Sequence, residues 1–312
     1  MPRAAAADRL RRRAEGAAEG MAGLEPTALL VVNRRSRRGA DAAASAAESL
    51  RRAGVGVVDG TCEDAAGLPD LIRETAARVD RVVVGGGDGT LNAALPGLLD
   101  AGLPLGVLPL GTANDLARTL GIPTELEAAA AVAAGGRVRR IDVGEVNGHP
   151  FFNVASVGFG VDLTRALTRD AKSRWGRLGY GVAALRALAR LQPFRAEIVE
   201  DGAAQVTRTV HIAVGNGRHY GGGMTISEDA RLDDGRLDLY SLEVTSAWQL
   251  LRLLPALRRG RYEGWAAVRT LKGQDILIRT RRPRSVNADG EIVTRTPARF
   301  RVRPAAVGVL TP

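Results

Sequence analysis

Several residue types are scarce in this sequence, and each scarcity excludes a class of protein. Cys62 is the only cysteine, so no internal disulfide framework can form, and a reducing compartment, the cytoplasm, is expected. His149, His211 and His219 show no zinc-type spacing with that cysteine. Aromatic residues make up only 4% of the chain, too few to supply stacking surfaces for nucleic acid, and no nucleic-acid partner is expected.

Long apolar runs and lysine are also lacking. No run approaches the roughly 18 apolar residues of a membrane-spanning helix, and the N-terminus has no apolar stretch of the secretory type. Residues 1–25 are expected to be a flexible extension, with Met21 as an alternative natural start. Lys172 and Lys272 are the only lysines, so arginine supplies nearly all of the formal net charge of +10. This charge permits anionic partners but does not choose among them.

The hydrophobic pattern predicts two domains, the usual arrangement for a chain of 312 residues. Over residues 27–108, apolar runs of strand length alternate with helical spacing of alanine and leucine, which favours a parallel sheet with helices on both faces. Beyond about residue 137, short β-like runs follow one another, which is typical of an antiparallel β-sandwich. The expected domains are 26–135 and 136–312, with the last residues returning to the first domain.

The individual elements follow from the same pattern. Strands are expected at 28–32, 55–58, 81–84, 105–108, 138–146, 151–157, 194–200, 206–214, 237–243, 275–280 and 299–303. Helices are expected at 40–53, 65–79, 90–100, 161–168 and 179–191. Asn147-Gly148 is typical of a hairpin turn.

A glycine cluster carries the strongest chemical signal. Residues 85–90 read Gly-Gly-Gly-Asp-Gly-Thr, after an apolar strand and before a helical pattern. Glycines let the backbone approach an anion closely, so this layout is typical of a phosphate-binding turn. Asp88 would repel phosphate, which indicates a metal ion or a proton in transit, and hence phosphoryl transfer. The alternative is a tight structural turn.

A second strand-turn-helix follows, and residues 108–118 read Leu-Pro-Leu-Gly-Thr-Ala-Asn-Asp-Leu-Ala-Arg. Its backbone amides and the Thr112 hydroxyl are candidate donors to phosphate oxygens. Because adjacent parallel strands end at one edge of a sheet, Asp115 is expected near Asp88. The Asn114-Asp115 pair is equally typical of a helix N-cap.

Together these turns resemble the diacylglycerol kinase catalytic-domain family, a lipid-kinase superfamily that includes sphingosine and ceramide kinases; the bacterial soluble type is the most similar. Further matching motifs lie at 141–144, 152–160, 175–180, 233–238 and 289–291, so the likeness covers about 27–310. It implies an N-terminal α/β domain of NAD-kinase/phosphofructokinase-like type and a β-sandwich that takes the lipid. It also implies ATP and Mg²⁺ as cofactors and a lipid hydroxyl as acceptor.

The resemblance assigns nucleotide contacts residue by residue. The matching positions are Asn33, Ser36, Thr61, Gly86, Gly87, Asp88, Gly89, Thr90, Leu91, Asn92, Thr112 and Asn114. One segment departs from the family, whose first strand ends in Asn-Pro-x-Ser-Gly. This chain has Asn-Arg-Arg-Ser-Arg-Arg-Gly at 33–39, so the arginines either strengthen phosphate binding or change the shape of the loop.

Acidic positions complete the site that the resemblance implies. Asp88, Asp115 and Asp142 match residues that line it and hold the magnesium of Mg·ATP. In the Asp289-Gly290-Glu291 turn one carboxylate accepts the proton of the lipid hydroxyl. Residues i and i+2 usually face differently, so Glu291 is preferred to Asp289, although the sequence leaves both open.

A second magnesium site, with a structural role, is implied at residues 231–236. Its ligands would be the Asp234 carboxylate and the carbonyl oxygens of Arg231 and Arg236, since magnesium prefers hard oxygen donors.

Residues 246–261 combine Trp248 and several leucines with arginines, which predicts a helix. This helix either packs on the β domain or lies in the interface of an anionic membrane. The leading hypothesis is an ATP-dependent kinase of diacylglycerol or a related lipid, acting at the inner face of the membrane. Alternatives are a NAD kinase-like enzyme and a catalytically weak lipid- or nucleotide-binding regulator. A homodimer is left open.

Overall fold

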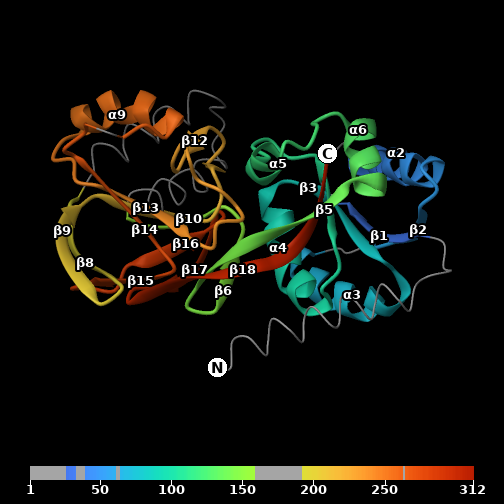
Figure 1. The fold of residues 1–312 in the computed structure, drawn as a ribbon, viewed down its shortest axis with the longest axis horizontal. Helices are drawn as coiled ribbons and strands as arrows, with labels where there is room; N and C mark the ends of the chain where they lie inside the picture. The colour runs from blue at the N-terminus through green and yellow to red at the C-terminus, as the bar shows by residue number, and fades with distance from the viewer. Residues whose placement is uncertain (1–25, 33–38, 61–63, 159–191, 263) are drawn as a thin grey trace, which may run out of the picture. The chain divides into compact units, whose positions relative to one another are not determined.

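The structure is a computed structural model, and it describes residues 26–32, 39–60, 64–158, 192–262 and 264–312 (Figure 1). Several expectations lie outside these residues: the extension over 1–25, the loop at 33–38 with Asn33 and Ser36, Thr61, and the helices at 161–168 and 179–191. Among the described helices, none is long and apolar enough to cross a bilayer.

The described chain forms two compact units. Unit 1 contains residues up to 111, 120–140 and 307–312, and unit 2 contains 112–119 and 141–306. The chain passes between the units four times: after residue 111, after residue 119, and within the strands β5 (Arg137–Val146) and β18 (Ala298–Thr311). The short segment 112–119 belongs to unit 2. The predicted boundary near residue 135 places this segment in the first domain instead.

Unit 1 is the predicted α/β domain. Its parallel strands run in the order β2 (Gly56–Asp59), β1 (Thr27–Val32), β3 (Arg81–Gly86) and β4 (Leu105–Pro109), and the end of β18 pairs with β4. The central strands are buried along almost their whole length, as expected when helices cover both faces. The parallel sheet predicted from the apolar runs is therefore confirmed.

Helices cover both faces of this sheet. They are α2 (Gly39–Arg52), α3 (Leu68–Thr75), α4 (Asp88–Ala101) and α6 (Leu126–Gly135), with single turns of 3-10 helix on either side of α3. Figure 1 shows α2 and α6 on one side of the strands and α3 on the other. The α6 helix is capped by the Glu125 carboxylate, which accepts N–H bonds from Glu127 and Ala128. This helix is absent from the prediction.

Unit 2 is a sandwich of two largely antiparallel sheets. One sheet has the order β14 (Val268–Gly273), β13 (Leu237–Leu242), β10 (His211–Gly215), β7 (Val154–Gly158), β16 (Ser285–Ala288) and β17 (Glu291–Arg295). The other contains β18, β15 (Asp275–Thr280), β8 (Phe194–Glu200) and β9 (Ala203–Thr209), while β5 pairs with β18 and with β6 (His149–Phe151). One apolar cluster draws Ile212 and Leu239 from the first sheet and Ile276 and Phe300 from the second. The predicted sandwich is confirmed.

Some predicted strands of unit 2 differ in detail. The expected strand at 151–157 is two strands, β6 and β7, and that at 206–214 is divided into β9 and β10. The β14, β16 and β17 strands and the short pair β11 (His219–Tyr220) and β12 (Met224–Thr225) are not predicted. The hairpin turn is present: Asn147 and Gly148 both have positive φ, as a two-residue turn of this type requires.

The α9 helix (Ala247–Arg259) packs on one sheet of unit 2. It begins at the Ser246 cap and ends at Gly260, which has a left-handed φ of 70°. Leu250, Leu253 and Leu257, spaced three and four residues apart, are buried in a second apolar cluster. The predicted helix at 246–261 is therefore present, and one of its faces packs on the β domain.

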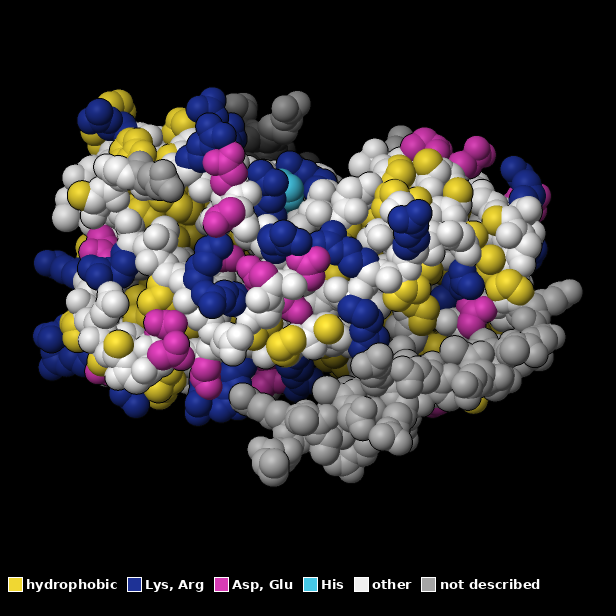
Figure 2. All heavy atoms as spheres, in the orientation of Figure 1, with side chains coloured by type: hydrophobic (Ala, Val, Ile, Leu, Met, Phe, Trp, Pro, Cys, Tyr) yellow, Lys and Arg dark blue, Asp and Glu magenta, His cyan; other side chains and the backbone are white. Residues whose placement is uncertain are grey.

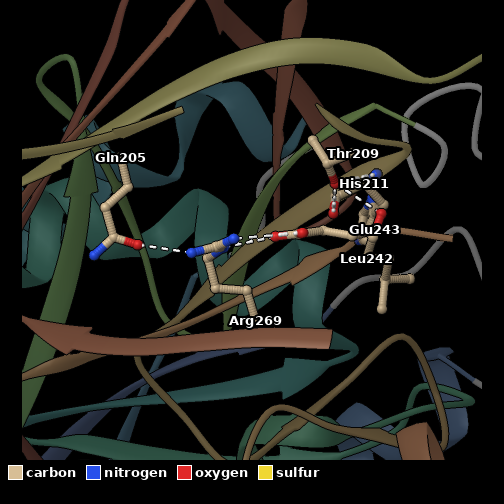
Figure 3. A network of polar contacts seen from close by, with 6 residues as sticks. All are labelled: Gln205, Thr209, His211, Leu242, Glu243 and Arg269. Carbon is tan, nitrogen blue, oxygen red and sulfur yellow. Dashed lines mark hydrogen bonds and ion pairs between the residues drawn. The ribbon is translucent and has the colours of Figure 1, made fainter. Parts of the chain in front are cut away.

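Polar contacts join β9 to β10, β13 and β14 of the other sheet in unit 2 (Figure 3). The Thr209 hydroxyl lies 2.9 Å from the carbonyl oxygens of His211 and Leu242, and it accepts the His211 N–H at 3.2 Å. Arg269 binds the Glu243 carboxylate at 2.6 Å through Nε and Gln205 at 2.9 Å through Nη1. Thr209 and His211 are buried, so their contacts satisfy polar groups that would otherwise be costly to bury, whereas the Arg269–Gln205 hydrogen bond is exposed.

The buried His211 makes the stability of unit 2 sensitive to acid. Burial lowers the pKa of its imidazole from 6.5 to about 4. Below pH 6.5 the His211 imidazole binds a proton in the unfolded chain, whereas in the folded chain it does so only below about pH 4. Acid therefore favours unfolding. We expect the wild-type chain to lose about 3 kcal/mol more than His211→Gln between neutral pH and pH 4. Urea unfolding of both proteins at a series of pH values measures this, and parallel curves would contradict it.

Gly144 in β5 lies against the ring of Phe151, its partner in the β5–β6 hairpin. A Cβ at this position would lie 2.3 Å from the Phe151 ring, with no room to move because both residues are buried. We expect Gly144→Ala to lower the free energy of unfolding by about 1–3 kcal/mol. Gly135→Ala is the control, since a Cβ there meets nothing within 4 Å, and thermal unfolding compares the two. Equal midpoints would refute this packing constraint.

Candidate active site

The glycine turn of unit 1 is closely packed on one side and open on the other. A Cβ on Gly86 would lie 2.6 Å from the Thr90 hydroxyl, so only glycine fits where β3 ends. A Cβ on Gly89, in contrast, would meet nothing within 4 Å. The α4 helix begins at Asp88, directly in the turn, so its first backbone N–H groups and its positive dipole end lie there. The turn therefore has the geometry of an anion site.

The second predicted turn begins beside the first, as expected for adjacent parallel strands. The Leu110 N–H donates to the Gly86 carbonyl at 3.0 Å, and a Cβ on Gly87 would lie 3.3 Å from the Gly111 Cα. Asn92, one helical turn into α4, has a buried Oδ1 with no hydrogen-bond partner among the described residues. An amide oxygen left in this state is available to a donor on a ligand, which fits the nucleotide role implied for Asn92.

Residues 112–119, which carry the rest of the second motif, belong to unit 2. Thr112 is exposed, and its hydroxyl has no partner within the described part of the chain. Asn114 is buried with a positive φ of 51°, and its carbonyl accepts the Arg118 N–H at the start of α5 (Asp115–Leu120). Asn114 thus shapes the turn through its backbone, and its nucleotide contact stays a prediction.

Asp115 is buried and already engaged within unit 2. One of its oxygens accepts the Gly222 N–H at 2.9 Å, and the other lies 3.6 Å from the Arg118 guanidinium. Asp88 belongs to unit 1, whereas Asp115 and Asp142 belong to unit 2. Their convergence on one magnesium ion therefore stays a prediction.

Asp142 fastens three segments of unit 2. Its carboxylate oxygens accept the N–H groups of Gly235 and Ala305, each at 2.7 Å. Its own N–H donates to the Leu232 carbonyl, and its carbonyl accepts from the Asn216 side chain. Burial, as the main cause, raises the pKa of this carboxyl, and the two backbone hydrogen bonds oppose that rise. Both oxygens thus have protein donors, which is the pattern of a structural anchor.

The loop at 231–236 carries the one exposed carboxylate of the implied structural magnesium site, that of Asp234. Asp234 is exposed, and its Oδ1 accepts the Arg236 N–H at 3.0 Å, while its other oxygen has no partner among the described residues. The charges of Asp234 and Asp233 also raise the pKa of Asp142, although Asp233 forms an ion pair with Arg231 at 3.1 Å. No group of three or more acidic, histidine or cysteine side chains suited to a metal is found in the described part of the chain. A metal here would depend on one carboxylate with backbone carbonyls, as the resemblance implies.

The Asp-Gly-Glu turn separates the two acidic residues into different roles. The Asp289 carboxylate accepts the N–H groups of Phe152, Asn153 and Val154 at 2.7–3.2 Å, and Asp289 itself has a positive φ of 43°. Glu291 is exposed, and its carboxylate has no partner among the described residues. Asp289 therefore holds the turn to β7, whereas the Glu291 carboxylate is open to solvent.

Asn216 is a site residue that the sequence reasoning misses. Its buried side chain donates to the carbonyls of Asp142 at 2.9 Å and Phe152 at 3.0 Å, and its N–H donates to the Asn153 carbonyl. It thereby joins the segment fastened by Asp142 to the segment that holds Asp289. The Gly-Asn-Gly run after an apolar strand is the only signal for it in the sequence, and such runs are common in ordinary turns.

The two carboxylates of the turn should respond differently to loss of charge. In Asp289→Asn an amide NH₂ would face a backbone N–H whichever way it is oriented, so we expect a loss of about 1–3 kcal/mol in unfolding free energy. Glu291→Gln should change it by less than about 0.5 kcal/mol, because the side chain is exposed. Urea unfolding measures both variants, and equal losses would contradict the separation of roles.

A glycine-turn α/β unit joined to a β-sandwich that carries an acidic turn defines a two-unit kinase class. Family models agree: the diacylglycerol kinase catalytic domain matches residues 27–146, and the YegS C-terminal NAD kinase beta sandwich-like domain matches 155–311. The chain belongs to the diacylglycerol kinase family and is a lipid kinase. The family implies ATP as the phosphoryl donor.

Curated relatives support this assignment, and a solved structure shows the same fold. The chain is 35% identical over 281 residues to a diacylglycerol kinase of Mycobacterium tuberculosis, covering 87% of this chain and 90% of that one. It is 33% identical over 232 residues to a diacylglycerol kinase of Bacillus subtilis, covering 73% and 77%. A crystal structure of a Bacillus anthracis diacylglycerol kinase superposes with a TM-score of 0.72 at 22% identity, covering 92% and 97%, and shows the same fold.

Proposed function

We propose that this lipid kinase phosphorylates the free hydroxyl of diacylglycerol, using Mg·ATP, in the cytoplasm at the inner face of the membrane. The acceptor is taken from the names of the relatives, two of which are diacylglycerol kinases. The observation that carries the chemistry is the exposed Glu291 carboxylate, held on a turn that Asp289 anchors through three backbone N–H groups. Oligomeric state, including a homodimer, stays open.

Proton transfer is the task of Glu291 in this proposal. A lipid hydroxyl is a weak nucleophile at neutral pH, so a positioned base assists as the oxygen attacks the γ-phosphorus. The O–H proton passes to Glu291, the new O–P bond forms, and the bond from the γ-phosphorus to the β,γ-bridging oxygen breaks to release ADP. An anchored turn favours this step because the base does not have to be ordered during the reaction.

Phosphate binding is the task of the glycine turn. The open approach at Gly89, the helix N-terminus at Asp88 and the orphaned Asn92 oxygen support nucleotide binding there. Magnesium would neutralise charge on the transferred phosphoryl group, with Asp88 as its candidate carboxylate beside the phosphates. A separate structural ion would be held by Asp234 with the carbonyls of Arg231 and Arg236.

Phosphorylation of a lipid panel by labelled ATP tests the proposal. We expect product with diacylglycerol in mixed micelles, none after chelation of divalent cations, and none with NAD as acceptor. Glu291→Gln should lower kcat by roughly 10²- to 10⁴-fold, the usual contribution of a general base. Glu200→Gln is the matched control, because it removes an acidic group elsewhere in unit 2 that has no partner among the described residues.

Other outcomes separate the alternatives. Label on NAD and none on lipid would overturn the proposed acceptor in favour of a NAD kinase-like enzyme. Binding of ATP without turnover on any acceptor would favour the regulator. Asp88→Ala should abolish transfer, and unchanged turnover in that variant would refute its assigned role.

A further inference from the structure

A cavity of about 440 Å³ in unit 2 is lined by a surplus of positive charge. Its charged lining consists of Arg118, Arg218, His219, Glu228, Arg258, Arg259 and Arg261. These residues come from separate places in the chain: the end of α5, the loop before β11, the segment after β12, and the end of α9. Five arginines thus face one carboxylate.

That one carboxylate is already neutralised. Glu228 accepts two hydrogen bonds from the Arg261 guanidinium, each at 2.6 Å. Arg118 lies 3.6 Å from the carboxylate of Asp115, a residue that is not part of the cavity lining. The guanidinium groups of Arg218, Arg258 and Arg259 form no hydrogen bond or salt bridge with the described residues, and the charge of Arg218 helps to lower the pKa of Glu228. Three uncompensated guanidinium groups therefore line the cavity.

The pKa of the neighbouring His219 is also affected by the positive charge of the cavity. His219 lies with Nδ1 3.1 Å from the Thr119 hydroxyl. Burial is the main cause that lowers the pKa of its imidazole, and the charges of Arg118 and Arg218 lower it further. Cations at the end of a helix are ordinarily favourable, which accounts for Arg258 and Arg259 in the last turn of α9. It does not account for Arg218, which comes from another segment.

The end of α9 is held in place, so its arginines are presented from a fixed position. Thr225 donates its hydroxyl to the Arg258 carbonyl at 2.9 Å. A Cβ on Gly260 would lie 2.6 Å from Thr225 and 2.9 Å from the Glu228 backbone nitrogen, so the chain approaches closely there. Guanidinium groups fixed around a cavity match the oxygens of a phosphate group, which they bind in pairs of parallel hydrogen bonds.

The outer face of α9 continues this surface with apolar side chains. Trp248 is 68% exposed and Leu251 is 41% exposed, on the face opposite the buried leucines. Arg252 and Arg259 share that exposed face at helical spacing. Figure 2 shows hydrophobic and basic side chains together over α9, and basic ones beside β12. Exposed Trp and Leu between arginines are typical of a helix that lies in a membrane interface.

We propose that the arginine cavity binds the phosphate headgroup of an anionic phospholipid while the exposed face of α9 lies in the bilayer surface. The charge of the cavity selects an anion, and the apolar residues beside it select a lipid over a free phosphate. This site is distinct from the proton-transfer turn at Glu291. It would hold the enzyme on membranes that contain phosphomonoester or other anionic lipids.

Vesicle binding tests this proposal without ATP or diacylglycerol. Because phosphatidic acid is also the product of the proposed reaction, the cavity variants and their control, and not binding alone, distinguish the cavity from the active site. Phosphatidylcholine vesicles with and without phosphatidic acid are sedimented with the full chain. We expect binding only with phosphatidic acid, and a roughly 10- to 30-fold loss of affinity in Arg218→Gln/Arg259→Gln. Arg281→Gln/Arg282→Gln is the control, because it removes the same charge from an exposed loop of unit 2. An equal loss in both double variants would show general charge attraction and overturn the site.

Two further measurements identify the source of the phosphate. Trp248→Ser should also weaken vesicle binding, and an unchanged affinity would overturn the role of α9. Calorimetry with glycerol 3-phosphate, a soluble phosphomonoester, should show much weaker binding than the vesicles. Tight binding of glycerol 3-phosphate that is lost in Arg218→Gln/Arg259→Gln, with no vesicle binding, would overturn the lipid in favour of a free phosphate.

Discussion

The buried carboxylate of Asp142 is the contact on which the rest of unit 2 depends. It lies in β5, one of the two strands by which the chain passes between units, and it accepts the N–H of Ala305 in β18, the other such strand. Ala305 has a positive φ of 47°, which a residue with a Cβ rarely adopts, so this hydrogen bond offsets a strained backbone. The same carboxylate orients the acidic loop at 231–236 through Gly235. One charge therefore fixes both strands and the loop.

Acidic residues in this protein divide into those that hold backbone and those that stay free. Asp142 and Asp289 accept several backbone N–H groups, and Asp115 accepts one from Gly222. Glu291 has no such partner in the described structure. Anchoring carboxylates give a nearby reactive one a rigid setting, because backbone N–H groups stabilise the charged form of the anchor and fix its position. In the Asp289-Gly290-Glu291 turn, one acidic residue thus holds the backbone that carries the other.

The sequence predicts the architecture well because its signals are local. Apolar strands such as Val82–Val84, the glycine turn and the Asn147-Gly148 hairpin each follow from a few neighbouring residues. It does not predict α6, whose alanine-rich stretch has little amphipathic pattern, or the exposed strand β17, whose register depends on its neighbour β16. The roles of Asp289 and Asn216 were equally out of reach, because their partners are more than 60 residues away in the chain. The sequence shows which polar groups are present. Only the tertiary contacts show which of them already form hydrogen bonds within the protein.

The parallel sheet of unit 1 has a consequence for how the protein is made. Its strand beside β4 is the end of β18, where Val309 pairs with Leu105, and all of unit 2 lies between them in the chain. During synthesis the β4 edge therefore waits, unpaired, until some 200 residues have followed it from the ribosome. Contacts so distant in sequence form slowly, and an open strand edge can pair with another chain meanwhile. Unit 1 is the first to emerge from the ribosome and the last to be completed.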